Sequence, residues 1–323
     1  DVYKRQTRCC ASGISRSFWT TDIYETTNGN EVTMSKIAIL TDSSCDIPQE
    51  MAEKYGIDIT SFHILLDDVD YVERESCTNT EFYDKMRLSK GVPSTAAITP
   101  IQFCEKYCQY VDEGYTDVIH VPINKSGSST YNNALMAQGM LREERPEHHM
   151  KIHLLDPHTY SMVFGWYLCE MARKLKNGAE ISHVIQEFEK QMNCMEIVLG
   201  PYSLKQMKKS GRISAAAAVM GELMGVRPII TLIDGKTKVE SKVRGDDKVV
   251  PAMIELCKKR SDGVENFDYM IGHTNIKQAE DLEKACRKAF GKAPLVVFEL
   301  GGVVSANTGP DTVALVYTGH PRG

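Results

Sequence analysis

Short apolar runs alternate with amphipathic stretches along most of the chain. The runs KIAIL (36–40), DVIHVPI (117–123) and KIHLLD (151–156) are each followed by a segment with apolar residues at helical spacing. Alternating strands and helices are typical of an α/β fold built on a parallel sheet. The pattern therefore predicts an N-terminal lobe with a mostly parallel sheet.

Local signals predict where several helices begin and end. Thr78 and Glu81 form a capping-box pattern, and Thr99 with Pro100 has the pattern of an N-cap followed by a first helical position. The helix after Thr99 is expected to bury one face, made of Ile101, Phe103, Cys104, Tyr107, Cys108 and Val111. A longer helix is predicted over about 159–177, ended by Asn-Gly.

The character of the chain changes after about residue 196. The stretch RPIITLIDGKTKVESKV predicts a hairpin that turns at Asp234-Gly235. Further strands are predicted in FDYMIGHTN, APLVVFEL and DTVALVYTG, with helices near 247–260 and 276–290. We therefore expect two α/β lobes, over 34–195 and 196–323. The second should contain a mixed sheet with a hairpin.

The first 33 residues differ from the rest. They show no clear hydrophobic period and lack the apolar core of a signal peptide, whereas a strand pattern begins directly after Met34. This segment is interpreted as a non-native or unstructured extension, with Met34 as the expected start of the protein.

Composition narrows the classes of function. Charged residues make up 25% of the chain, the net charge is −5, and no long Lys/Arg run occurs, which argues against nucleic acid as a partner. No apolar stretch approaches the roughly 20 residues needed to cross a bilayer. The ten cysteines include no C-x-x-C pair and no zinc-finger spacing, so we expect no metal site and a reducing cytoplasm.

Hydroxyl side chains gather in the segment NKSGSSTYNN (124–133), between a predicted strand and a predicted helix. They are Ser126, Ser128, Ser129 and Thr130. Open α/β sheets bind ligands at the carboxyl ends of their strands, and a helix N-terminus there favours an anion. Simple N-capping explains the hydroxyls equally well. Because P-loop and dinucleotide motifs are absent, a single carboxylate suits this turn better than a triphosphate.

Three other positions are candidates, each with an ordinary structural explanation. Thr95 lies in the loop VPSTAAITP, His273 ends an apolar strand, and Arg212 follows a glycine in KKSGRIS. A loop threonine, a hydrogen-bonded histidine and a surface arginine account for them without a ligand. Apolar walls for a cavity could come from SAAAAVMGELMG (214–225) and from the alternating Phe62, Ile64 and Leu66, although core packing explains these too.

Taken together, these segments resemble the DegV family of fatty-acid-binding proteins. The resemblance is carried by TDSSCDIP (41–48), VPSTAAITPIQF (92–103), INKSGSSTYNNA (123–134) and LKQMKKSGRIS (204–214), with the downstream hairpin, IGHTN and NTGPDTVALVY. It extends over about residues 36–319. Departures from the family pattern include Ala96-Ala97, the Gly-Ser-Ser-Thr of 127–130 and Asn307.

The resemblance implies a protein that buries one long-chain fatty acid between two lobes. It implies that Thr95 and Ser128 hold the carboxylate, with His273 and Arg212 nearby. It also implies presentation of the acid to a separate fatty acid kinase, which phosphorylates the carboxylate with ATP to an acyl-phosphate. The binding protein would then be non-catalytic and need no cofactor. The sequence leaves open the chain length of the ligand, the oligomeric state and transient contact with a membrane.

Two other functions are alternatives to fatty acid binding. Ser128 and His273, with Asp42 or Asp46 orienting the histidine, could form a serine hydrolase site, but the G-x-S-x-G elbow is missing. A DNA-associated regulator is disfavoured by the acidic balance and by the lack of a helix-turn-helix pattern.

Overall fold

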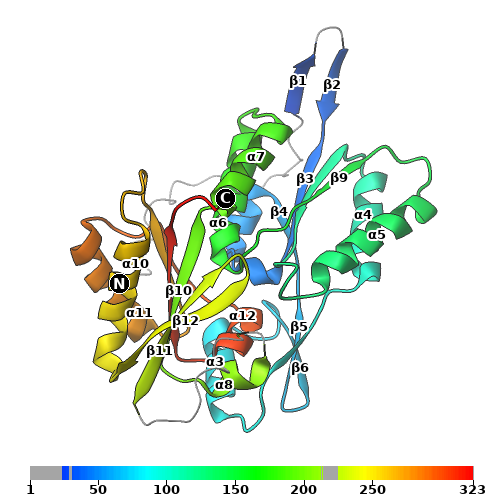
Figure 1. Ribbon diagram of the computed structural model, residues 1–323. Helices are drawn as coiled ribbons and strands as arrows, with labels where there is room; N and C mark the ends of the chain where they lie inside the picture. Colours follow the sequence, from blue (N-terminus) through cyan, green and yellow to red (C-terminus); the bar gives the residue numbers. More distant parts are fainter. Residues whose placement is uncertain (1–23, 29–30, 212, 214–224, 323) are drawn as a thin grey trace, which may run out of the picture.

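The computed structural model describes residues 24–28, 31–211, 213 and 225–322. Two sheets and three helical layers make up the main body (Figure 1). The order of layers is helices α4 and α5, a parallel sheet, helices α6 and α7, a mixed sheet, and helices α10 and α11. This architecture confirms the predicted α/β class with one parallel and one mixed sheet.

The parallel sheet has the strand order β4-β3-β8-β9. Its strands are β3 (Ile37–Asp42), β4 (Ile57–Thr60), β8 (Asp117–Val121) and β9 (Lys151–Leu154). Its helices are α2 (Gln49–Tyr55), α4 (Pro100–Asp112), α5 (Thr130–Glu144), α6 (Met162–Lys176) and α7 (Ile181–Met192). A small antiparallel sheet, β6-β5-β7, lies beside it and contains β5 (His63–Leu66), β6 (Val69–Val72) and β7 (Ser94–Ala96).

The mixed sheet has six strands in the order β12-β11-β10-β15-β13-β14. They are β10 (Met195–Pro201), β11 (Val226–Ile233), β12 (Lys236–Arg244), β13 (Tyr269–His273), β14 (Val297–Glu299) and β15 (Thr312–Thr318). The associated helices are α8 (Lys205–Ser210), α10 (Val249–Arg260), α11 (Ile276–Phe290) and α12 (Gly302–Thr308). The described residues also form the 3-10 turns η2 (Ser43–Cys45) and η3 (Asp246–Lys248).

Side-chain alternation along the strands divides the core into layers. On β3, Ile39 faces the central cluster with α6 and α7, whereas Ala38 and Leu40 face α4 and α5. On β10, Leu199 faces the same central cluster and Val198 faces α10 and α11. The central cluster is therefore shared by both sheets. A cavity within it would be walled by both halves of the chain.

Most local predictions are confirmed. Both capping boxes are present, from Thr78 to α3 (Asn79–Leu88) and from Thr99 to α4. The hairpin turns at Asp234-Gly235, where φ is +51° and +70°, a left-handed conformation that Gly adopts without strain and that Asp tolerates.

Three details differ from the predictions. The run IDITSFHILL (57–66), for which the sequence predicts a strand, forms two strands in separate sheets, β4 and β5, because the chain leaves the parallel sheet after Thr60. Ile101 is 60% exposed because it lies off the buried face of α4, where Tyr110 is buried instead. Part of the extension expected to be unstructured forms a hairpin, β1 (Tyr24–Asn28) paired with β2 (Glu31–Ser35). Lobe boundaries at 34 and 196 stay predictions.

Candidate binding cavity between the two sheets

A cavity of about 230 Å³ lies within the central core cluster. Its apolar walls come from the mixed sheet, from the loops that follow strands of the parallel sheet, and from α6 and α12. They include Phe62, Ile123, Val163, Ile197, Leu199, Ile213, Leu232, Phe298, Leu300, Val303, Val304, Ala314 and Val316. Polar side chains on the wall are Thr95, Ser128, Ser129, Tyr160, Ser161, Thr237, Asn307 and Thr308. No Lys, Arg, Asp, Glu or His is among the described residues that line it.

The hydroxyl-rich turn contributes directly to this wall. Within the turn, Ser126 is used structurally, because its N–H and Oγ both donate to Asn124 Oδ1, at 2.8 and 2.9 Å. Thr130 is fully buried at the start of α5, whereas Ser128 and Ser129 line the cavity. Ser128 Oγ also accepts from Thr130 N at 3.2 Å. The N-cap residue of α5 is Ser129, which makes no side-chain capping bond, so Ser128 is a cavity residue that is also bonded to the first residue of α5.

Thr95 reaches the same cavity from a different part of the chain. It lies on β7, where it pairs with Ile64 of β5. The segment after β7 is tied to α5 because Asn133 Nδ2 donates to Ile98 O at 2.7 Å. The structure therefore brings Thr95 and Ser128, two of the predicted site residues, to one cavity.

His273, the third predicted site residue, does not line this cavity. Gly272 lies beside His273 on β13. A Cβ added at Gly272 would point at Phe298 and Leu300 of the cavity wall. Alternation along β13 then puts His273 on the opposite face, with Tyr269 and Ile271 in the cluster against α10 and α11. Burial lowers the pKa of His273 to about 4, so its ring is neutral at pH 7. Arg212 and the proposed wall at 214–224 lie outside the described residues.

Because His273 faces away from Ser128, the described residues do not assemble the serine hydrolase pair. The predicted orienting carboxylates have structural roles instead. Asp42 Oδ2 accepts from Ile123 N at 2.6 Å and Oδ1 accepts from Ser44 N at 3.1 Å, which fixes the chain that enters the hydroxyl-rich turn. Burial raises the pKa of Asp42 to about 7, although these N–H groups favour the anion.

Two neighbouring carboxyl groups, of the buried Glu73 and the partly buried Asp46, connect the lobes beside the cavity. Glu73 Oε1 accepts from Val303 N of α12 at 2.8 Å, and Oε2 accepts from Ser43 Oγ. Asp46 accepts from Ser161 Oγ. Burial, reinforced by their mutual repulsion, raises the pKa of Asp46 well above its usual range, and burial raises that of Glu73. The pair thus positions α12 and Ser161, both parts of the cavity wall.

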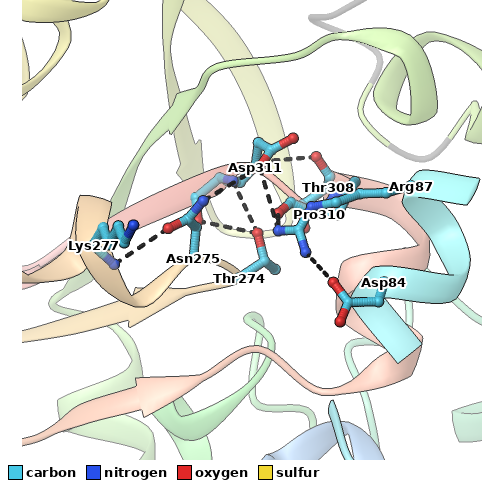
Figure 2. Close-up of polar contacts among 9 residues, drawn as sticks. Asp84, Arg87, Thr274, Asn275, Lys277, Thr308, Pro310 and Asp311 are labelled. Atoms are coloured by element: carbon cyan, nitrogen blue, oxygen red, sulfur yellow. Dashed lines mark hydrogen bonds and ion pairs between the residues drawn. The ribbon is translucent and has the colours of Figure 1, made fainter. Parts of the chain in front are cut away.

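A second polar network holds the chain that follows α12 (Figure 2). Arg87 of α3 donates from Nη2 to Pro310 O at 2.7 Å and pairs with Asp84 at 2.7 Å. Asp311 Oδ1 accepts from Arg87 and from Asn275 Nδ2, both at 3.4 Å. The network anchors the loop directly after Thr308, the last cavity-lining residue of α12.

The tip of the β11–β12 hairpin completes the wall from the mixed sheet. Gly235 lines the cavity, and a Cβ there would lie 2.3 Å from Asn124 Nδ2 and 2.4 Å from Ser126 Oγ. Next to it, Asp234 Oδ1 lies 2.9 Å from His158 Nδ1. The hairpin tip therefore packs directly on the hydroxyl-rich turn, with a glycine where no side chain would fit.

Sequence reasoning missed Tyr160, Ser161, Asn307 and Thr308 as cavity residues. A signal for the first two was available. They follow β9, whose carboxyl end lies at the same edge of the parallel sheet as the hydroxyl-rich turn. Asn307 and Thr308 come from α12, a short helix that the apolar pattern did not reveal.

Other site types find no support in the part of the chain that the structure describes. There, no group of three or more His, Cys, Asp or Glu side chains is arranged to hold a metal ion. The helices of the same part are all too short or too polar to cross a bilayer.

A family profile and a curated relative both match most of this chain. The profile of the family described as "Uncharacterised protein, DegV family" matches residues 36–319. A DegV domain-containing protein of Clostridium perfringens is 28% identical over 293 residues, covering 88% of this chain and 99% of the relative.

Solved structures agree with the sequence comparison. The fatty acid binding DegV family protein of Streptococcus agalactiae is 26% identical, with a TM-score of 0.77 over 88% of this chain and 99% of that one. The fatty acid (stearic acid)-binding protein of Eubacterium ventriosum shares the fold, with 22% identity and a TM-score of 0.80 over 88% of this chain and 98% of that one.

Proposed function

The chain belongs to the DegV family, and we propose that it binds a long-chain fatty acid in the cavity between its two sheets. The observation that carries the proposal is that Thr95 and Ser128, far apart in sequence, line one cavity whose remaining wall is largely apolar. Fatty acid binding by the Streptococcus agalactiae relative supports it.

The hydrocarbon chain and the carboxylate of the ligand would contribute differently to binding. Each buried methylene contributes about 0.8 kcal/mol, so fourteen of them would supply roughly 11 kcal/mol before ordering costs. A desolvated carboxylate needs donors, since leaving it unpaired costs several kcal/mol. The hydroxyl of Thr95, on β7, and that of Ser128, beside the N-terminus of α5, would meet that need. The chain drives binding and the hydroxyls orient the acid.

The protein would act as a carrier without chemistry of its own. It would present the bound acid to a separate fatty acid kinase, which transfers a phosphoryl group to the carboxylate. Arg212 is proposed to act in kinase engagement. An Arg212→Ala variant that binds fatty acid normally but supports less acyl-phosphate formation would agree with this role. Normal acyl-phosphate formation by the variant would rule it out.

Head-group variants test the binding site. Ser128→Ala and Thr95→Val should each weaken fatty acid binding by about 1–3 kcal/mol, roughly 5- to 150-fold, through an unmet bond to the carboxylate. The assay is displacement of a fluorescent fatty acid. Ser126→Ala is the matched control, because its hydroxyl is bonded inside the same turn and does not line the cavity.

Two further measurements complete this test. Melting curves of each variant are needed, because Ser128 Oγ also accepts from Thr130 N, and the loss of that bond lowers stability by about 1 kcal/mol. Native mass spectrometry of the purified protein, followed by denaturing extraction, should show a co-purified fatty acid. Unchanged affinity in both Ser128→Ala and Thr95→Val would remove the proposed head-group site.

A further inference from the structure

At the hydroxyl-rich turn, the side chain of Tyr160 packs against Gly127. Both line the cavity. A Cβ added at Gly127 would lie 2.3 Å from Tyr160 Oη, 2.8 Å from Cε1 and 2.9 Å from Cζ. Gly127 is not among the residues with positive φ, so its backbone conformation does not require glycine. The side chain is absent because the tyrosine ring occupies its place.

This contact positions a hydroxyl beside Ser128. Since Tyr160 Oη packs on the backbone of Gly127, the residue directly before Ser128, the phenol lies at the part of the cavity where the carboxylate is proposed to bind. The ring itself packs between the central core cluster and the cluster around α4 and α5. Its position is therefore set by both clusters.

The backbone next to Tyr160 is also fixed. Ser161 is 3% exposed, its N–H donates to Ser44 O at 2.9 Å, and its Oγ donates to the partly buried Asp46. Its φ of +67° is unusual for a residue with a side chain and is held by these bonds. A tyrosine attached to such an anchored residue presents its hydroxyl at a defined place.

A carboxylate can accept about four hydrogen bonds, and Thr95 and Ser128 each supply one donor. The described wall offers no cationic side chain that could satisfy the rest. We propose that the Tyr160 hydroxyl is a third donor to the ligand carboxylate, and that Gly127 is needed to admit it. This inference rests on the proposed function. It assigns a recognition residue that the sequence analysis did not identify.

Tyr160→Phe tests the inference because it removes the hydroxyl and keeps the ring against Gly127. Affinity for a fatty acid should fall about 10- to 100-fold. Affinity for the methyl ester of the same acid should change less than about 2-fold, because an ester carries no charge to be held. Both ligands are measured by displacement of the same fluorescent probe, with circular dichroism and melting curves as the control for folding.

Gly127→Ala adds a second measurement. The new methyl group should displace the ring and weaken acid binding, but it should weaken it much less in the Tyr160→Phe background, where the hydroxyl contact is already lost. Such coupling is not expected if Gly127 merely shapes the turn. Equal losses in both backgrounds would therefore count against the proposal.

The outcomes separate this inference from the proposed function. If the natural protein binds no fatty acid, the proposed function fails and the role of Tyr160 with it. If Ser128→Ala weakens binding but Tyr160→Phe does not, only the role of Tyr160 is wrong. If Tyr160→Phe weakens acid and ester equally, the residue contacts the chain rather than the carboxylate, and the proposal is again overturned.

Discussion

Glu73 offers a sharp test of how the two lobes are joined. Truncation in Glu73→Ala would leave Val303 N and Ser43 Oγ without their partner in a buried environment. Each unsatisfied group costs about 1–3 kcal/mol, so the loss of unfolding free energy should be about 2–6 kcal/mol. At about 2–4 °C per kcal/mol for a chain of this size class, the melting temperature should fall by roughly 5–20 °C.

Glu73→Gln separates hydrogen bonding from charge. The amide oxygen can still accept from Val303 N, and Ser43 Oγ can accept from the amide N–H₂ instead of donating, so the expected loss is about 1 kcal/mol or less. The pKa of Glu73 is raised by burial. Protonated Glu73 therefore contributes its full stabilisation below about pH 4.3, the ordinary pKa of a glutamic acid. This contribution is lost as pH rises through the pKa that Glu73 has in the folded protein.

The pH dependence gives the decisive comparison. As pH is raised from 5 to 8, the natural protein should lose more stability than Glu73→Gln, since only the natural side chain must be ionised in a buried site. The unfolding free energies of the natural protein and of Glu73→Gln are measured by urea unfolding at several pH values, followed by circular dichroism. A Glu73→Ala protein that melts within about 2 °C of the natural one, or a Glu73→Gln protein with the natural pH dependence, would refute the reasoning.

Four further predictions concern packing, the cavity and the polar contact of Arg87. Gly165→Ala should lower the unfolding free energy by more than about 2 kcal/mol, because its Cβ would lie 2.3 Å from the backbone oxygen of Cys45. Gly139→Ala, in α5 with no atom within 4 Å of the added carbon, should instead raise it by about 0.5–1 kcal/mol, and urea midpoints test both. Ala314→Phe should fill the cavity and abolish displaceable binding of a fluorescent fatty acid while the melting temperature stays within a few degrees. Arg87→Ala should shift the urea midpoint by an equivalent of about 0.5–1.5 kcal/mol, since its bond to Pro310 O is partly exposed; a loss above about 3 kcal/mol would contradict this.

Signals that act within a few residues were predictable from sequence. The capping box at Thr78, the N-cap at Thr99 and the Asp234-Gly235 turn are confirmed, because the bonds or φ values that define them involve only neighbouring residues. The division of IDITSFHILL between two sheets was not predictable, since both halves have strand character and only tertiary pairing separates them.

The candidate site, too, was predictable only where local sequence determines it. The rule that ligands bind at the carboxyl edge of a parallel sheet identified Ser128 correctly as a cavity residue, but it specifies an edge and not a face. His273 is at the end of a strand, yet alternation directs it to the opposite face from the cavity. Tyr160 was missed because its role depends on a contact with Gly127, 33 residues away in sequence, which no local pattern records.

The cavity itself constrains what the protein does. Cavities among apolar side chains cost about 24 cal/mol per Å³, so a volume of about 230 Å³ corresponds to roughly 5 kcal/mol of packing energy. The polar framework that holds the walls apart is correspondingly strong, with Glu73 bonded to α12 and Asp42 bonded to Ile123. Because a bound apolar chain would restore that packing energy, the fold that keeps this volume open gains most from a ligand that is long, flexible and apolar along nearly all its length.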